Sequence, residues 1–449
     1  MNERITAIRY RALRSTRRSD TRTDGLRDES MNQTVGDSAI LREAKARAHF
    51  YRNRPLVIRP GELLVGDYPR EETDKVQAPK IFDRQSWQGG RSWEVPDSLE
   101  VFFESGLLSW AGNHKTLDYD AVFAMGLDGL RAKIATRIDR LDALEPDYAQ
   151  KRDFLDSLEI VAEAYVDLSN RYADYALELS VDEADPARSR ELRVIAENCR
   201  RVPAAPPTGF WEACQCAWFS FFLVPDAPGR VDQYLYPFYA MDMESGAITR
   251  EFAKELISCL WLKYFESVGP QSGVSAHNHL TLGGVKHDGS DATNVVTRLC
   301  LEVTEELALL RPQIGLRCSK DTPTDVIEQA IGVLRAKTGN PDFCNDEQIV
   351  PALASVGVSL KDARNFSLSG CHEVIVTGMA QMGSVEGFVN MGKIVRMALG
   401  LEPSFPRGTD PTGTDLSGVE SFDDFWTRIV EAMDFVAETA HCASLARDK

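Results

Sequence analysis

Side chains capable of thiol and acid–base chemistry are concentrated in one short run, Ser367-Leu-Ser-Gly-Cys-His-Glu373. Gly370 is expected to end a short strand, and three reactive side chains follow it. In an extended chain alternate residues share a face, so Cys371 and Glu373 would point one way and His372 the other. A thiol beside a carboxylate suits hydrogen abstraction or nucleophilic attack by sulfur, coupled to proton transfer by the acid. The other interpretation of Cys371 is a structural cysteine.

Imidazoles elsewhere in the chain could serve this thiol or a metal. The candidates for a Cys–His pair are His114, His277, His279 and His441, because such partners are neighbours in space rather than in sequence. No hydrolase motif surrounds any of them. His277 and His279 would share one strand face, but two imidazoles without a third ligand give little support to a catalytic metal. We therefore expect no metal and keep a cysteine hydrolase as a minor alternative.

Composition excludes several classes of protein. The chain has 449 residues, 43% of them hydrophobic, and a formal net charge of −17. The acidic balance argues against broad contact with nucleic acid or an anionic membrane. No run approaches the roughly 18 apolar residues that a membrane span needs. The nine cysteines are scattered and form no C-x-x-C pair, which predicts a cytoplasmic protein with free thiols.

Helical and strand patterns alternate along the chain. Apolar residues recur every three or four positions over 122–141 and 154–179, and cap signals predict further helices after Thr249, over 291–310, from 321 to 339 and after Ser359. Short apolar runs at 280–282, 313–317 and 366–368 predict strands between them. This alternation indicates an α/β fold around a sheet or barrel. Residues 1–39 are expected to form a polar arm, and residues 40–449 one domain.

Several stretches match one family. They are Pro60-Gly-Glu-Leu-Leu-Val-Gly66, Gly229-Arg-Val-Asp-Gln-Tyr-Leu-Tyr-Pro237, Leu280-Thr-Leu-Gly-Gly284, Asn345-Asp-Glu347, Asp362-Ala-Arg364 and Gly370-Cys-His-Glu373. In their order and spacing the chain, from about residue 40 onward, resembles the glycyl radical enzymes, which include pyruvate formate-lyase. The resemblance implies an α/β fold in which this chain forms the first half of a ten-stranded barrel surrounded by helices, with the cysteine on a central finger loop.

The same resemblance implies roles for individual residues. Cys371 would become a thiyl radical that abstracts hydrogen from the substrate, and Glu373 would act as a base on a substrate hydroxyl. His114 would contact the substrate, as a histidine does in dehydratases of this kind. His277, Asn278 and His372 are further predicted substrate-binding residues. A buried histidine with a purely structural role is the alternative for His114 and His277.

The sequence also departs from the family pattern. No second cysteine adjoins Cys371, which disfavours acyl transfer to coenzyme A. His372 and Val374 stand where the usual lyase pattern has Val and Pro, and the position of a second dehydratase acid falls near Val385, beside Glu386. Only 78 residues follow Cys371, and no Arg-Val-x-Gly-aromatic motif occurs. The expectation is that the chain lacks the glycyl radical domain.

The sequence therefore predicts an anaerobic, cytoplasmic lyase or dehydratase component acting on a small polar substrate. No cofactor is expected in this chain itself. Its radical would come from a glycine on a second polypeptide in a hetero-oligomer, installed by a radical-SAM activase. The alternative is a non-catalytic homologue that binds a small molecule or a partner subunit, motivated by the missing glycine motif.

Overall fold

The computed structural model describes residues 1–17, 25–67, 70–72, 97–110, 114–269, 278–336, 338–370, 372–382, 387–401 and 419–447. The chain divides into two compact units. The first contains Met1–Lys80 and Lys115–Ala380, and the second contains Ile81–His114 and Gln381–Lys449. No helix among the described residues combines the length and the apolar character that a membrane span requires.

A four-stranded parallel sheet forms the centre of the first unit. Its strands β5 (Gly229–Arg230), β6 (His279–Gly283), β7 (Gln313–Cys318) and β8 (Asp342–Asn345) lie side by side in sequence order. Parallel neighbours need crossover connections, and helices supply them here: α9 (Val231–Ser245) and α10 (Arg250–Val268), then α11 (Val295–Leu307), then α12 (Thr324–Leu334). All five residues of β6 are buried, as expected for a parallel sheet covered on both faces.

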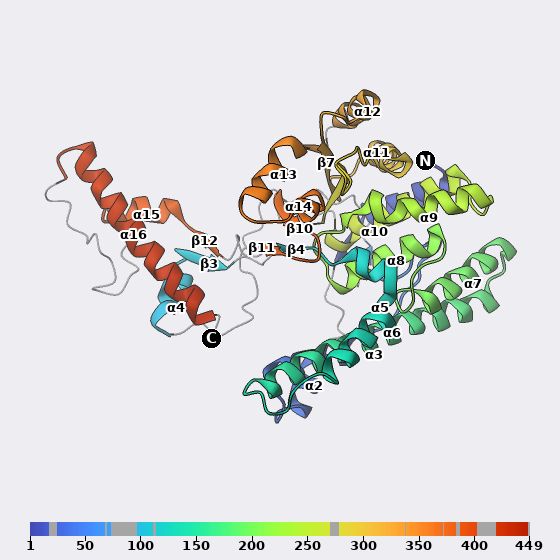
Figure 1. The fold of residues 1–449 in the computed structure, drawn as a ribbon, viewed down its shortest axis with the longest axis horizontal. Coiled ribbons are helices and arrows are strands. Elements are labelled where there is room, and N and C mark those ends of the chain that lie inside the picture. Colours follow the sequence, from blue (N-terminus) through green and yellow to red (C-terminus); the bar gives the residue numbers. More distant parts are fainter. Residues whose placement is uncertain are drawn as a thin grey trace. The chain divides into compact units, whose positions relative to one another are not determined.

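The first unit contains further helices. They are α1 (Glu3–Ala12), α2 (Leu26–Gln33), α3 (Ala39–Asn53), α5 (Tyr119–Ile138), α6 (Tyr148–Asp182), α7 (Pro186–Arg201), α8 (Phe210–Leu223), α13 (Asp346–Ser355) and α14 (Leu360–Arg364). Helix α6 packs against both α3 and α7 (Figure 1). Ile5 and Ile8 of α1 are buried in the main hydrophobic core. The division into an arm over residues 1–39 and a domain over 40–449 stays a prediction.

The predicted helices and strands are observed close to their expected positions. Thr249 caps α10 by accepting the Phe252 N–H at 3.1 Å. Ser359 caps α14 in the same way, because its Oγ accepts the Asp362 N–H at 3.2 Å. The three apolar runs expected to be strands lie in β6, β7 and β9 (Phe366–Ser369). Local capping and periodicity therefore determined these elements.

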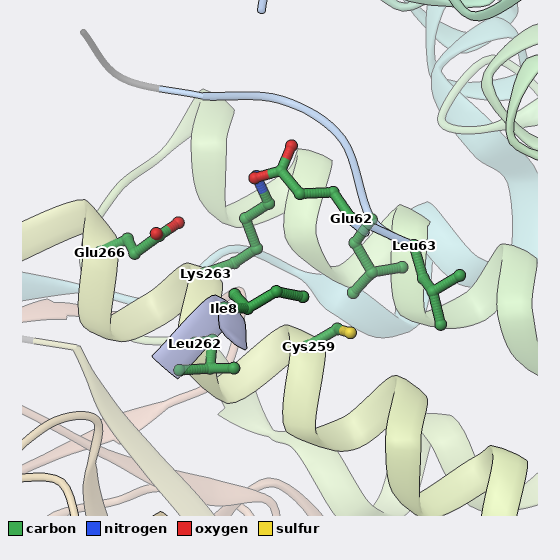
Figure 2. A pocket seen from close by; sticks show the side chains of 8 residues that line it. Ile8, Glu62, Leu63, Cys259, Leu262, Lys263 and Glu266 are labelled. Carbon is green, nitrogen blue, oxygen red and sulfur yellow. The ribbon is translucent and has the colours of Figure 1, made fainter. Parts of the chain in front are cut away.

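Side chains rather than a β-ladder hold the Glu62–Asp67 segment. Gln215 of α8 meets both backbone groups of Val65: its Nε2 donates to the carbonyl and its Oε1 accepts the N–H, each at 2.8 Å. The Trp218 indole donates to the Gly66 carbonyl at 2.9 Å. Lys263 of α10 reaches Glu62 at 2.8 Å beside a small pocket (Figure 2). Both side chains of this ion pair are almost fully buried.

The second unit has a separate small core. The elements of this unit are helix α4 (Asp97–Glu104), the antiparallel strands β3 (Leu108–Trp110) and β12 (Gly387–Val389), and helices α15 (Met391–Ala398) and α16 (Phe422–Arg447).

The remaining short strands of the described chain are β1 (Ser15–Arg17) and β2 (Arg70–Glu72), which pair antiparallel, β4 (His114–Lys115), β10 (Glu373–Val376) and β11 (Gln381–Met382).

Candidate active site

The predicted reactive run forms a tight hairpin, which we call the cysteine hairpin (Phe366–Val376). Strands β9 and β10 pair antiparallel with Glu373 opposite Ser369. Between these strands lies the loop tip, of which Gly370 and His372 are described, and the His372 N–H donates to the Ser369 carbonyl at 3.1 Å. Gly370 has φ +49° and His372 has φ +89°. The backbone at Gly370 and His372 therefore turns instead of extending. The shared face of Cys371 and Glu373 stays a prediction, because Cys371 lies outside the described residues.

Two of the predicted site residues, Cys371 and His277, lie outside the described residues. The chain on both sides of Cys371 is nevertheless defined. Gly370 follows the buried strand β9, and Glu373 begins β10 as a half-buried residue.

Side chains from the sheet and from a neighbouring loop fix the cysteine hairpin. The Leu368 N–H donates to Thr281 Oγ1 of β6 at 2.8 Å. At the start of β9, Arg317 of β7 donates to the Phe366 carbonyl at 2.7 Å. At the end of β9, the buried Ser369 hydroxyl donates to the Asp226 carboxylate at 3.0 Å. These contacts bind β9 at both ends without making it a member of the main sheet.

A buried group of charges supports the base of this hairpin. Arg317 and Asp346 form two hydrogen bonds at 2.7 and 2.9 Å, and both side chains are almost completely buried. Arg230 lies in the same region and donates to the carbonyls of Gly283 and Val285 at 2.9 and 3.0 Å. Burial and the positive charge of Arg317 lower the pKa of Arg230 to about 9. These cations satisfy backbone carbonyls, so their role here is structural.

Gly315 of β7 leaves the space into which the hairpin packs. A Cβ atom at this position would lie 2.2 Å from Leu368 Cδ1 and 2.9 Å from His279 Nε2. Such distances are far inside van der Waals contact, and close-packed interiors resist even one added methylene. The glycine is therefore required by a close approach of β9 and His279 to the strand.

Two histidine rings and one carboxylate lie close together at the loop tip. His279 Nδ1 lies 3.3 Å from the Gly370 carbonyl, and His372 Nε2 lies 3.1 Å from Asp342 Oδ2. The two rings contact edge to face, with centroids 5.1 Å apart. Burial, with the neighbouring His372, lowers the pKa of His279 to about 3. His279 is therefore neutral at physiological pH.

Asn278 and His114, two other predicted site residues, are both described by the structure. Asn278 is buried, and its amide donates to the Tyr264 carbonyl at 2.7 Å. Its Oδ1 has no hydrogen-bond partner among the described residues. His114 is buried at the start of β4 and belongs to the second unit. The structure thus brings His372 and Glu373 together on one hairpin and leaves the substrate-binding roles of His114 and Asn278 as predictions.

Most described cysteines are unsuited to chemistry. Cys199, Cys214, Cys216, Cys259 and Cys300 are buried core residues. Burial raises the pKa of Cys216 to about 12, of Cys318 to about 12 and of Cys344 to about 11. These thiols stay protonated at neutral pH. No group of three His, Cys, Asp or Glu residues able to hold a metal is found in the described part of the chain.

Sequence comparison agrees with this architecture. A model of the family described as pyruvate formate lyase-like matches residues 98–448. The chain belongs to this family. As a pyruvate formate lyase-like protein it is 29% identical to trans-4-hydroxy-L-proline dehydratase of Clostridioides difficile, over 90% of this chain and 60% of the relative. It is 28% identical to isethionate sulfite-lyase of Desulfovibrio desulfuricans, over 92% of this chain and 58% of that enzyme.

A solved structure confirms the predicted fold of this pyruvate formate lyase-like chain. A glycyl radical enzyme from Archaeoglobus fulgidus superposes with a TM-score of 0.80 at 26% identity, covering 98% of this chain and 64% of that one. The fold is that of part of the glycyl radical enzyme barrel. This chain spans about 60% of the length of the curated relatives.

Sequence reasoning missed several residues that shape the site. The sequence suggests His279 only as a partner for the thiol or half of a metal pair, whereas the structure places it against the Gly370 carbonyl. Asp342 and Asp226 are not predicted at all, because a lone aspartate in a segment of unknown tertiary position carries no sequence signal. Only the packing of β9 against the sheet brings them to the hairpin.

Proposed function

We propose that this chain is a thiyl-radical lyase or dehydratase component that acts on a small polar substrate. Cys371 abstracts hydrogen, and Glu373 is the general base. The observation that supports this most strongly is the cysteine hairpin itself, whose strand β9 is fixed at both ends while its tip carries Cys371 and leads into Glu373. The relatives, a dehydratase and a sulfite-lyase, support elimination chemistry.

The reaction would proceed by exchange of one hydrogen atom. The Cys371 sulfur radical takes hydrogen from a substrate carbon, so that an S–H bond forms and a C–H bond breaks. Glu373 accepts the proton of the substrate hydroxyl, and the leaving group departs from the neighbouring carbon. The product radical then takes hydrogen back from Cys371. The enclosing barrel would exclude water and competing hydrogen donors.

Other groups complete this proposal. The 449 residues contain no Arg-Val-x-Gly-aromatic motif, so the unpaired electron would come from a glycine outside them. We place that glycine on a second polypeptide, where a radical-SAM activase would install it. This implies an anaerobic, cytoplasmic hetero-oligomer. His114, His277, Asn278 and His372 remain the proposed substrate-binding residues.

The decisive test uses this chain with its partner and activase under anoxic conditions. The expected result is a glycine-centred EPR signal and turnover of a small hydroxylated substrate, with trans-4-hydroxy-L-proline and isethionate as first candidates. Cys371→Ser should keep the EPR signal and lose turnover, and Glu373→Gln should lower turnover about 10²–10⁴-fold. If the complex forms but shows neither signal nor turnover, the non-catalytic binding function replaces this one.

A further inference from the structure

Polar side chains at the starts of β6 and β8 contact the loop tip, and one at the start of β7 contacts the residue on β8. His279 begins β6, Gln313 begins β7 and Asp342 begins β8. Because these strands are parallel and adjacent, their first residues lie at the same edge of the sheet. His279 contacts the Gly370 carbonyl at 3.3 Å, and Asp342 contacts His372 at 3.1 Å. One edge of the sheet thus holds both ends of the loop tip.

The chemistry of the acceptors fixes where the protons are. A carbonyl oxygen can only accept, so His279 Nδ1 carries the hydrogen in its contact with Gly370. His372 Nε2 lies 3.1 Å from Asp342 Oδ2 and forms an ion pair with it when the imidazole is protonated. The same oxygen accepts Gln313 Nε2 at 2.7 Å. Asp342 therefore joins the loop tip to β7 as well as to its own strand β8.

The backbone at His372 explains why such a contact is needed. His372 has φ +89°, and Ala308 at the end of α11 is the other non-glycine residue with positive φ in the described chain. This conformation costs free energy in a residue that carries a Cβ, and it persists only when surrounding contacts enforce it. His372 Nε2 lies 3.1 Å from Asp342 Oδ2, so the carboxylate of Asp342 is a side-chain contact of the strained residue that comes from outside the loop tip.

We propose that Asp342 is a positioning residue that holds His372 and thereby fixes the direction in which the loop tip presents Cys371 and Glu373. The role of Asp342 in presenting Cys371 and Glu373 rests on the proposed function, whereas the contact between Asp342 and His372 is observed independently of it. His372 is then a structural part of the loop, with Nε2 engaged by Asp342 and only Nδ1 left for a substrate. The pairing gives a physical reason for histidine at a position where the usual lyase pattern has valine.

Hydrogen exchange measured by mass spectrometry on the full chain tests this contact. In Asp342→Ala the amides of residues 370–373 should exchange at least tenfold faster than in the wild type. The control is Gln313→Ala, which removes the hydrogen bond from Gln313 Nε2 to Asp342 Oδ2 and should change the exchange by less than threefold. Equal exchange in Asp342→Ala and Gln313→Ala would overturn the proposal.

Rescue by a conservative variant separates positioning from general packing. His372→Gln keeps a nitrogen donor at a similar reach, whereas His372→Leu keeps the size and loses the donor. Exchange in His372→Gln should stay within about threefold of the wild type, and His372→Leu should match Asp342→Ala. The double variant Asp342→Ala with His372→Leu should be no faster than either single variant, because the pair acts as one unit. Additive effects in the double variant would contradict the pairing.

The reactivity of Cys371 provides a measurement that does not depend on turnover. Alkylation by iodoacetamide, assigned by peptide mass spectrometry, is compared with that of the exposed Cys442 in the same sample. The ratio of the two rates should rise at least fivefold in Asp342→Ala and stay near the wild-type value in His372→Gln. An unchanged ratio in Asp342→Ala would refute the positioning role, whereas failure of the proposed lyase activity would leave these results intact.

Discussion

Side chains of other elements fix both the Glu62–Asp67 segment and the cysteine hairpin, but the two segments differ in how far they are buried. Each is a short piece of chain outside the four-stranded sheet, and side chains of other elements satisfy its backbone. In the first segment, Gln215 and two tryptophans complete the bonding in a closed core. In the hairpin, the base is equally buried, but His372 at the tip is 40% exposed and has positive φ.

This difference separates a segment that is fixed within the core from a loop tip whose backbone is strained at His372. Buried side-chain bonds to the backbone make the Glu62–Asp67 segment a structural part of the core. The same kind of bonds at the base of the hairpin support a tip whose conformation is unfavourable by itself. Backbone strain of this kind concentrates at functional sites, and it persists only where the surrounding structure enforces it. Variants at the base of the hairpin should therefore affect global stability, whereas variants at the tip should act locally.

The largest effect is expected from Arg317→Met at the hairpin base. Removing the guanidinium leaves Asp346 buried without its charge partner, which should cost about 3–5 kcal/mol in the free energy of unfolding, measured by urea denaturation. The control is Arg52→Met, which breaks exposed ion pairs with Glu163 and Asp167 and should cost at most about 1 kcal/mol. Similar losses in the two variants would refute the structural role of the buried pair.

A somewhat smaller effect is expected from Gln215→Leu in the comparison segment. The Val65 N–H and carbonyl would both lose their buried partner, and the free energy of unfolding should fall by about 2–4 kcal/mol. Gln329→Leu serves as the matched control, since it removes a single half-buried bond to the Arg298 carbonyl and should cost about 1 kcal/mol. If the two glutamine variants unfold at the same urea concentration, side-chain anchoring of Glu62–Asp67 is not what stabilises it.

Gly315→Ala should push the cysteine hairpin away from the sheet. The added methyl overlaps Leu368 and His279, and overpacking of this kind costs about 1–3 kcal/mol. Hydrogen exchange of residues 366–376 should increase along with this loss of stability. Gly332→Ala in α12, where a Cβ meets nothing within 4 Å, should instead be neutral or stabilising by up to about 1 kcal/mol. Equal changes in the free energy of unfolding for Gly315→Ala and Gly332→Ala would show that the close approach at Gly315 does not contribute to stability.

The smallest effect, measured over the single pH unit between about pH 5 and 6, concerns the pH dependence of stability. Because burial lowers the pKa of His279 from its ordinary 6.5 to about 3 in the folded chain, only the unfolded state binds the extra proton as pH falls below 6.5. Stability from this group is therefore complete above pH 6.5 and decreases toward pH 3, with a slope approaching about 1.4 kcal/mol per pH unit. His279→Asn keeps a donor for the Gly370 carbonyl and should show a shallower slope between about pH 5 and 6. Parallel curves for the two proteins would disprove the burial of a neutral His279.

Much of the fold could be predicted from local patterns. The helix after Thr249 and the short helix after Ser359 begin at the expected residues because capping depends on groups three positions apart. Apolar runs predicted strands β6, β7 and β9, and family motifs gave the barrel. The resemblance predicted a loop at the cysteine, but the extended backbone expected for residues 371–373 excludes the positive φ that His372 adopts.

The sequence by itself determined which residues can do chemistry and which family the chain belongs to, because both depend on residue types and their spacing along the chain. It could not show that Asp342 at the start of β8 would contact His372 in the hairpin loop. That contact exists only because parallel strands bring their first residues to one edge and β9 packs across them. Tertiary structure decided the environment of the loop tip, since distances between remote residues depend on packing and not on sequence separation.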